Sequence, residues 1–222
     1  MSTVGLEARA RAYAALGDPY RLSIIDLLAN ADLASGELGA RLEISTNLIA
    51  HHLRVLEEAG LILRRRSEGD GRRTYVTRTD ACNDLLGAGG VARPHKVAFI
   101  CSQNSARSQL AESYWRTVSD IPVVSGGTHP ARRVHPKAVA VGRRHGLDLT
   151  VARPRLAADV LSGDELLIAV CDRAYEDLDG TPLHWSIPDP ALAGNSGAFE
   201  GAYDDITGRI IRLAASFQGG PS

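Results

Sequence analysis

One stretch of the sequence joins an apolar run to a polar loop and a helix start: Val97-Ala98-Phe99-Ile100-Cys101-Ser102-Gln103-Asn104-Ser105-Ala106-Arg107-Ser108. The run Val97–Ile100 is apolar throughout, which is typical of a parallel strand covered on both faces. Five residues separate Cys101 from Arg107, and Ser108 follows the arginine. A loop of this length between a strand and a helix can turn successive backbone N–H groups towards one point, which the helix N-terminus also faces. The stretch therefore predicts an anion-binding cradle at the end of a buried strand.

The side chains of this loop suit a tetrahedral dianion. Arg107 offers a planar, two-pronged donor for phosphate-like oxygens. Cys101 lies at the base of the cradle, in a positive field that favours a nucleophilic thiolate, and Ser108 can donate a hydrogen bond to that sulfur. We therefore expect Cys101, Arg107 and Ser108 to be catalytic. The expected oxyanion-binding residues are Ser102, Gln103, Asn104, Ser105, Ala106 and Arg107, and Asn104 also tolerates a left-handed backbone.

We expect Asp189 to act as the general acid that protonates the leaving oxygen, because it lies between two prolines in a rigid loop. Taken alone, an aspartate before a proline is a common turn residue, and a cysteine at a strand end is commonly a core residue. The strand-to-helix placement of the loop, with Ser108 after Arg107, favours the catalytic interpretation.

The second half of the chain alternates strands with helices. Apolar runs predict strands at Val97–Ile100, Val123–Val124 and Glu165–Val170, and helical patterns cover Pro136–His145 and Asp204–Phe217. Such alternation predicts an α/β domain with a central parallel sheet, whose site lies at the carboxyl ends of the strands.

The first half has the pattern of a winged helix-turn-helix, an α+β fold of helices followed by a hairpin. The pair Asp18-Pro19 is typical of a helix start, with the aspartate as cap and the proline as first residue. We expect a second helix capped by Ser35, and a third that is capped by Ser45 or Thr46 and ended by Gly60. Two strands, Leu61–Leu63 and Thr74–Thr77, then form the hairpin.

The third of these helices is the expected recognition helix. Its first turn carries small polar groups, and in this motif that end enters the major groove of DNA. The hairpin carries five arginines, which can straddle a phosphate backbone. The alternative is a solvated helix and hairpin, since residues 1–90 hold 11 arginines against 12 Asp and Glu. The expected DNA-binding residues are Ser45, Thr46, Asn47, His51, His52, Arg54, Arg72 and Arg73.

The composition excludes several classes of protein. Of the 222 residues, 23% are charged and 44% hydrophobic, and the formal net charge is −1, so no bulk field draws the chain to a membrane. No apolar run approaches the roughly 20 residues of a membrane-spanning helix, and the N-terminus has no secretion signal. Three cysteines without an export signal indicate a reducing compartment, so we expect a cytoplasmic protein.

A glycine-rich seam separates the two halves. The stretch Leu86–Pro94 holds three glycines and a proline in nine residues, a composition typical of a flexible connector. We expect a winged helix-turn-helix domain over residues 1–86, a linker over residues 87–94 and an α/β domain over residues 95–222.

The segments Leu16–Leu22 and His51–Ile62 carry a resemblance to the ArsR/SmtB family of dimeric bacterial repressors, over about residues 5 to 80. The resemblance implies a homodimer on operator DNA, with the first and last helices of the domain at the dimer interface. Arsenite sensors of that family have a Cys-x-Cys pair where this chain has Gly36–Arg41, so we expect no arsenite site there.

The loop Cys101–Gln109, together with His184-Trp185 and Asp189-Pro190-Ala191, resembles the low-molecular-weight tyrosine phosphatases and, among them, the arsenate reductase branch. The resemblance covers about residues 95 to 217 and implies that family's fold. It also implies that the cradle binds arsenate or phosphate, and that the Cys101 thiolate forms an adduct with arsenate that a second thiol resolves. The phosphatases have aromatic residues after the Asp-Pro pair, where this chain has Ala191-Leu192.

The resemblance aligns Cys171 with the second redox cysteine of the thioredoxin-linked reductases, whose third cysteine falls at Leu178. The thiol relay is therefore incomplete. Either an external thiol completes the reaction, or Cys171 and Cys101 pair and the disulfide is reduced directly. We expect mycothiol with a mycoredoxin, or thioredoxin, as the external reductant, and no bound cofactor. Lysine occurs twice against 23 arginines, which favours an organism of high GC content and so mycothiol. The alternative for Cys171 is a buried thiol at a strand end.

Some reductases of this branch bind potassium, through positions that match Asn104, Glu112 and Ser125. The aspartate of that site falls at Arg155, so we expect no metal here.

Three hypotheses about function follow. The first is a transcriptional regulator fused to an arsenate reductase that serves in arsenic resistance. The second is a regulator whose second domain binds an oxyanion without turnover. The third is a phosphatase for proteins or small phosphoesters, which the missing aromatic residues disfavour.

Overall fold

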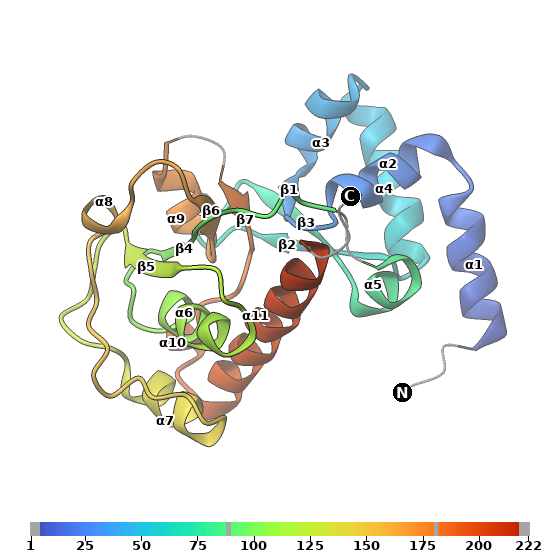
Figure 1. Cartoon of the computed structure of the whole chain (residues 1–222). Coiled ribbons are helices and arrows are strands. Elements are labelled where there is room, and N and C mark those ends of the chain that lie inside the picture. The colour runs from blue at the N-terminus through green and yellow to red at the C-terminus, as the bar shows by residue number, and fades with distance from the viewer. Residues whose placement is uncertain (1–4, 88–89, 180–181, 218–222) are drawn as a thin grey trace. The chain divides into compact units, whose positions relative to one another are not determined.

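The computed structural model describes residues 5–87, 90–179 and 182–217. The chain divides into two compact units, the first made of residues 1–67 and 71–89 and the second of residues 68–70 and 90–222 (Figure 1). The linker predicted over residues 87–94 includes residues 88 and 89, which lie outside the described residues. No helix within the described ranges is long and apolar enough to cross a membrane.

Over its described residues, 5–67 and 71–87, the first unit has five helices and a small sheet. The helix caps follow the sequence: the Asp18 carboxylate accepts from the Arg21 backbone at 3.0 Å, and Ser45 Oγ accepts from the Leu48 backbone at 3.3 Å. The elements are α1 (Leu6–Leu16), α2 (Pro19–Leu27), β1 (Leu33–Ala34), α3 (Ser35–Leu42), α4 (Thr46–Glu58), β2 (Ile62–Arg66), β3 (Thr74–Arg78) and α5 (Asp80–Leu86).

The sheet of the first unit is antiparallel, in the order β1-β3-β2. The apolar faces of α2, α3 and α4 meet over it and bury Ile25, Leu38 and Leu53. The predicted winged helix-turn-helix is thus confirmed, with one difference at the second helix. Ser35 is its first residue and not its cap, and the Glu37 carboxylate instead accepts from the Ala34 backbone at 2.6 Å.

The second unit alternates strands with helices, as predicted. Its elements are β4 (Val97–Cys101), α6 (Arg107–Val118), β5 (Val123–Gly127), α7 (Pro136–Arg144), α8 (Ala157–Val160), β6 (Leu166–Ala169), α9 (Asp172–Asp177), β7 (Leu183–His184), α10 (Pro190–Ala193) and α11 (Ser196–Ser216).

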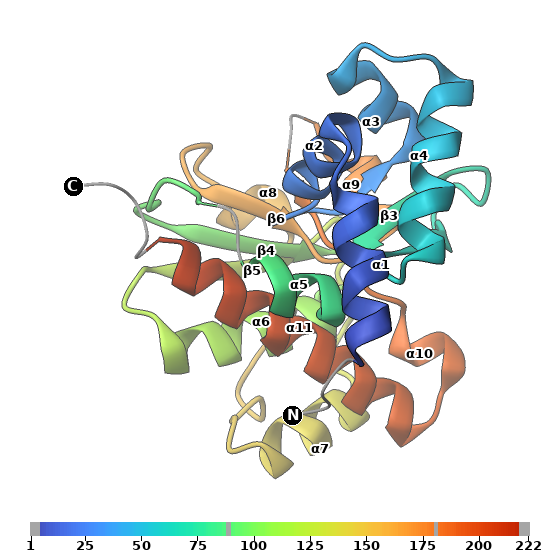
Figure 2. The same cartoon turned by 90° about the vertical axis from the view of Figure 1, so that its right-hand side faces the viewer.

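The four strands of the second unit form a parallel sheet in the order β5-β4-β6-β7. Figures 1 and 2 show α6 and α11 on one face of this sheet and α8 and α9 on the other. Because both faces are covered, β4 is buried at every position, and the rings of Phe99, Trp115 and Trp185 pack together at its centre. The predicted α/β architecture with a central parallel sheet is confirmed.

Most predicted ends differ from the observed ones by one to three residues, and the start of the closing helix differs by more. The closing helix begins at Ser196 and not at Asp204, and Asn195 caps it by accepting from the Ala198 backbone at 2.8 Å. Gly197 and Gly201 in its first turns lower the local helix propensity, which hides the start from the sequence pattern. The strand predicted at residues 123–124 extends to Gly127.

Candidate anion-binding site

The Cys101–Arg107 loop lies between the end of β4 and the start of α6. Strand β4 has β5 on one side and β6 on the other, so the loop emerges at the centre of the carboxyl edge of the sheet. Helix α6 begins at Arg107, which directs its N-terminus at the same place. This is the position at which open parallel sheets bind their ligands, and the backbone supplies a favourable field for an anion there.

The segment that follows β5, residues 128–135, donates backbone hydrogen bonds to four carbonyl groups of the loop, which therefore point outwards. Since the N–H of each peptide points opposite to its carbonyl, the N–H groups of Ser102, Gln103, Asn104 and Ala106 are turned away from that segment. One of them, the Asn104 N–H, donates to Cys101 Sγ at 3.1 Å. The outer hydrogen bonds run from the backbone N–H of Thr128 to Cys101 O at 3.1 Å, of His129 to Ser102 O at 2.7 Å, of Ala131 to Gln103 O at 2.9 Å and of His135 to Ser105 O at 2.8 Å.

Gly127 makes this close approach possible. A Cβ atom at this position would lie 2.8 Å from the carbonyl oxygen of Ser102 and 2.9 Å from the backbone nitrogen of Asn104. Both contacts are with backbone, so a larger residue would have to displace the loop itself.

Asn104 has φ +47°, and its side chain offsets the cost of this left-handed backbone. The side chain is fully buried and all of its polar atoms are paired. Its amide Nδ2 donates to Ser108 Oγ at 2.8 Å and to Ser125 Oγ at 2.9 Å. Its Oδ1 accepts from Gln109 Nε2 and from the Arg155 backbone, each at 2.9 Å.

The buried carboxylate of Glu112 fixes the direction of this network. Ser125 Oγ donates to Glu112 Oε2 at 2.5 Å, so it must accept from Asn104. Asn104 therefore presents its amide hydrogens to both serines, and Ser108 keeps its own hydrogen for Cys101 Sγ, 3.0 Å away. The network thus turns a hydrogen-bond donor towards the sulfur.

Two guanidinium groups neutralise Glu112. Arg116 donates to Oε1 at 2.6 Å and Arg155 to Oε2 at 2.8 Å. Asn104, Glu112 and Ser125 are the positions for which the resemblance implied potassium in other reductases, and here the Arg155 side chain lies on the carboxylate. Within the described ranges, no group of three His, Cys, Asp or Glu side chains is arranged to hold a metal ion.

Arg107 and Asp189, separated widely in the sequence, lie together at the cradle. The Arg107 guanidinium is 5% exposed, and it donates to the Ile187 carbonyl at 2.7 Å and lies 3.1 Å from Asp189 Oδ2. Burial opposes the charge, but the neighbouring Cys171, Cys101 and Asp189 outweigh burial and raise the pKa of Arg107. Asp189 is fixed at the start of α10, where its Oδ1 accepts from the Ala191 backbone at 3.0 Å. The structure thus brings together Cys101, Arg107, Ser108 and Asp189.

Cys171 follows β6, the strand beside β4, and so lies on the same edge of the sheet. Its thiol is free and 1% exposed, and its sulfur accepts from the Ala174 backbone at 3.4 Å at the start of α9. Burial raises the pKa of Cys171 to about 11, with the nearby Arg107 opposing and Cys101 adding to the increase. The Cys171 sulfur is therefore a protonated thiol at neutral pH.

The expected DNA-binding residues, with one exception, lie on the surface of the first unit. Ser45, Thr46 and Asn47 are exposed at the start of α4, and His51 and Arg54 are exposed on the following turns. Arg72 and Arg73 are exposed between β2 and β3.

His52 is the exception, and its assignment to the DNA-binding residues needs correction. It is 4% exposed and packs inside the unit, with its Nδ1 3.7 Å from Asp18 Oδ1 and its ring against Tyr20. Burial lowers the pKa of His52, although the Asp18 carboxylate opposes this. Successive helix residues point about 100° apart, so His51 and His52 cannot both face DNA.

Several residues that shape the cradle were not predicted for that role. The resemblance points to Glu112, Ser125 and Arg155 only as positions of a potassium site. It points to Gln109 only as part of the loop that resembles the arsenate reductases. Gly127 carried a signal that could have been used, since a glycine at the end of a strand often marks a close backbone approach.

Comparisons with known proteins agree with this division of the chain. Residues 96–220 match the family model described as low molecular weight phosphotyrosine protein phosphatase. Residues 18–63 match the model described as bacterial regulatory protein, arsR family. The phosphatase match lies in the second unit, and the arsR match lies in the first.

Individual relatives match the second unit. A putative arsenate reductase of Halobacterium salinarum is 30% identical over 132 residues, which is 55% of this chain and 92% of that protein. An arsenate reductase of Bacillus licheniformis is 30% identical over 131 residues, 53% of this chain and 94% of that protein. A solved structure of an arsenate reductase from Archaeoglobus fulgidus is 26% identical, with a TM-score of 0.48, over 54% of this chain and 98% of that one.

Proposed function

Because the chain belongs, over residues 96–220, to the low molecular weight phosphotyrosine protein phosphatase family, we propose that its second unit reduces arsenate to arsenite, and that its arsR-type first unit binds operator DNA. Both activities would serve arsenic resistance. The observation that carries the proposal is the sulfur of Cys101, which accepts from Ser108 Oγ and the Asn104 N–H inside a loop four of whose carbonyl groups point outwards. The arsenate reductases that match this unit support the choice of oxyanion.

In the first step, the cradle amides and Arg107 hold arsenate over the Cys101 thiolate. The sulfur attacks arsenic, a sulfur–arsenic bond forms, and one arsenic–oxygen bond breaks. Asp189 lies 3.1 Å from the guanidinium that holds the anion, so it is placed to donate the proton with which that oxygen leaves as water. Arsenic remains pentavalent in this step.

In the second step, an external thiolate attacks the Cys101 sulfur. A disulfide forms, the sulfur–arsenic bond breaks, and its electron pair reduces arsenic to the trivalent state, which leaves as arsenite. The thiol has to come from outside because Cys171 is buried and protonated at neutral pH, with its pKa raised to about 11, and Leu178 stands where a third cysteine would continue the relay. Mycothiol with a mycoredoxin, or thioredoxin, is the proposed reductant.

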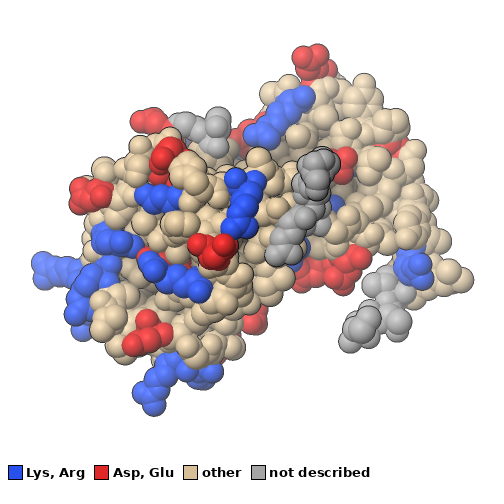
Figure 3. All heavy atoms as spheres, in the orientation of Figure 1, with Lys and Arg blue, Asp and Glu red and all other residues tan. Residues whose placement is uncertain are grey.

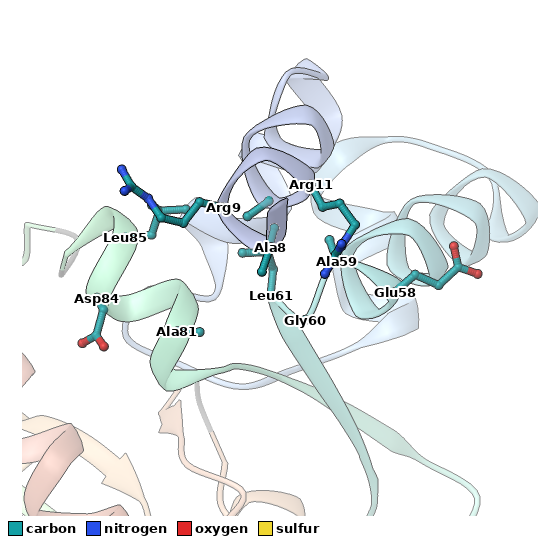
Figure 4. Close-up of a pocket in the computed structure, with 11 residues that line it drawn as sticks. Ala8, Arg9, Arg11, Glu58, Ala59, Gly60, Leu61, Ala81, Asp84 and Leu85 are labelled. Carbon is teal, nitrogen blue, oxygen red and sulfur yellow. The ribbon is translucent and has the colours of Figure 1, made fainter. Parts of the chain in front are cut away.

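We propose that the first unit binds DNA as a homodimer. A groove of about 490 Å³ lies between α1, the turn at residues 58–61 and α5, and small side chains such as Ala8, Ala59 and Ala81 line it (Figure 4). Arg9 and Arg11 lie on one element of the groove and Asp84 on another, so a two-fold axis would pair opposite charges of two copies. Exposed Leu6 and Tyr13 on α1 supply the apolar contacts.

Arsenate turnover tests the enzymatic part directly. The full chain is assayed for arsenite formation with mycothiol and mycoredoxin, with thioredoxin and its reductase, and with glutathione. We expect turnover with at least one system in the wild type and in Cys171→Ser, and none in Cys101→Ser. Absence of arsenite with every system would refute the reductase.

A regulator that senses the oxyanion without reducing it is the second candidate. The incomplete relay at Leu178 and the protonated Cys171 favour it. Operator affinity is measured with and without arsenate in the wild type and in Cys101→Ser. Coupling requires a difference in affinity, because a ligand with equal affinity for both states changes nothing.

A further inference from the structure

The segment of residues 128–135, which satisfies the carbonyl groups of the cradle, also carries two adjacent arginines. The Ala131 N–H donates to the Gln103 carbonyl at 2.9 Å, and the His135 N–H donates to the Ser105 carbonyl at 2.8 Å. Arg132 and Arg133 lie between these two anchor points, and both side chains are exposed. Their backbone is therefore fixed at the outer rim of the cradle while their guanidinium groups remain in solvent.

Most other cations of the second unit are neutralised locally. Residues 90–222 hold 14 Lys and Arg against 14 Asp and Glu, so the unit as a whole has no net field to attract an anion. Figure 3 shows basic side chains at the end of the unit where α7 lies. The ion pairs are Arg93–Asp120, Lys96–Glu165, Arg107–Asp189, Arg116–Glu112, Arg144–Glu200, Arg155–Glu112 and Arg209–Asp205.

Arg132 and Arg133 differ from these cations, because neither makes an ion pair or side-chain hydrogen bond with any residue that the structure describes. The carboxylate that contacts this segment, Asp177, is engaged by other residues: its Oδ2 accepts from Thr128 Oγ1 at 3.0 Å and lies 3.7 Å from His129 Nδ1. Two positive charges without an ion pair among the described residues thus flank the cradle, in a unit whose formal charges sum to zero when these two are included.

We propose that Arg132 and Arg133 form a basic rim that attracts tetrahedral dianions of the arsenate and phosphate class into the cradle. The proposal rests on the proposed function for the identity of the oxyanion. The rim acts through its long-range field and not through contact with the bound anion. It therefore raises the rate of association and leaves the chemical step unchanged.

A dianion is the ligand that gains most from this arrangement. Its attraction to the two guanidinium groups is twice that of a monoanion, and salt screens it, because both side chains are in solvent. The rim therefore favours arsenate and phosphate over monoanions and neutral molecules of the same size. The cradle amides alone would give a weaker preference.

Selective alkylation of Cys101 tests the rim without arsenate turnover. Iodoacetate is an anion and iodoacetamide is neutral, so the ratio of their rates at Cys101 reports the local potential, and the reactivity of the sulfur cancels. We expect Arg132→Ala/Arg133→Ala to lower this ratio by about threefold to tenfold at low ionic strength. Cys101→Ser supplies the background from the other cysteines.

The control is Arg93→Ala/Arg143→Ala, which removes the same formal charge from exposed positions of the same unit, one of them (Arg93) paired with Asp120. We expect it to leave the ratio within about twofold of the wild type. A ratio equally lowered by both double variants, or by neither, would overturn the proposal, because a rim effect has to be local.

Arsenate kinetics give the second readout. In the variant at residues 132 and 133 we expect kcat/KM to fall by about tenfold at low salt with kcat unchanged, and its dependence on ionic strength to flatten. If neither the wild type nor any variant turns over arsenate, the proposed reductase activity is refuted. The alkylation ratio then still tests whether Arg132 and Arg133 attract anions. If turnover occurs but kcat/KM is unchanged in the variant, the proposed role of the basic rim is refuted and the proposed reductase activity is not.

Discussion

Cys101 and Cys171 are equally buried but lie in different hydrogen-bonding environments. They are 2% and 1% exposed; Cys101 ends β4, and Cys171 lies two residues beyond β6, the neighbouring strand of the same parallel sheet. Cys101 Sγ accepts from the Asn104 N–H at 3.1 Å and faces Ser108 Oγ at 3.0 Å, whereas Cys171 Sγ has a longer bond of 3.4 Å from Ala174. Burial raises the pKa of Cys171 to about 11. The two thiols therefore differ in the donors that reach their sulfur atoms, and not in the extent of their burial.

The largest expected effect is the difference in reactivity between these two thiols. With the pKa of Cys171 raised to about 11 by burial, its thiolate is scarce at pH 7.5 and increases about tenfold per pH unit up to that value. We expect iodoacetamide to modify Cys101 at least about three orders of magnitude faster than Cys171 at pH 7.5. Peptide mapping by mass spectrometry over a pH series measures both rates, and comparable rates at neutral pH would contradict the comparison.

The second expected effect is the loss of the cradle in Gly127→Ala. The added methyl group would lie within 3 Å of two backbone atoms of the loop. We expect phosphate binding to weaken by at least about tenfold, and the free energy of unfolding to fall by about 1–3 kcal/mol. Protection of Cys101 from alkylation by phosphate measures the first quantity, and denaturant unfolding measures the second.

The matched control for this substitution is Gly201→Ala in α11, where an added methyl group meets nothing within 4 Å. We expect it to leave phosphate binding unchanged and to increase stability slightly, because alanine favours a helix. If both alanine variants bound phosphate as the wild type does, the close approach at Gly127 would not matter for the site.

A smaller effect is expected from the network that orients Ser108. In Asn104→Ala, two serine hydroxyls and two further donors lose their partner, so we expect alkylation of Cys101 to slow by about tenfold. Asn104→Gly relieves the left-handed backbone but also lacks the amide, so it separates the two contributions. If glycine restored the wild-type rate, backbone strain and not hydrogen bonding would control the sulfur.

The smallest expected effect concerns His52, the buried histidine of the first unit. Burial lowers the pKa of His52, so the unfolded chain binds a proton at a pH where the folded unit does not. Stability should therefore fall as the pH decreases through the unfolded value of about 6.5. His52→Phe should flatten this dependence, and His51→Ala, at an exposed position, should not. Thermal unfolding between pH 8 and pH 5.5 measures both.

The parts of the structure that depend on local sequence were predictable. The strand, the loop and the helix start around Cys101 follow from residues that are contiguous in the chain, and the caps at Asp18 and Ser45 follow from local hydrogen bonding. Asp189 was found because the chemistry of the loop requires a proton donor. Each of these predictions uses the sequence of one contiguous segment, or that sequence together with the reaction that its residues indicate.

The parts that depend on packing between distant segments were not predictable. The chain beyond β5 satisfies the carbonyl groups of the cradle, and Arg155 reaches Glu112 across 43 residues of sequence. Nothing in the local pattern at these positions signals such a pairing. The burial of His52 was not predictable for the same reason, because it depends on how α4 packs against α2 and not on the sequence around His52.

The central claim is that residues 101–107 hold a tetrahedral oxyanion against an ionised Cys101 sulfur. Crystals of the full chain soaked in arsenate, with diffraction data collected at the arsenic absorption edge, test it most directly. We predict an anomalous peak inside the loop, bonded to Cys101 Sγ or in contact with it, with the Arg107 guanidinium on its oxygens. A cradle without arsenic, in crystals where Cys101 remains accessible to alkylation, would contradict the account.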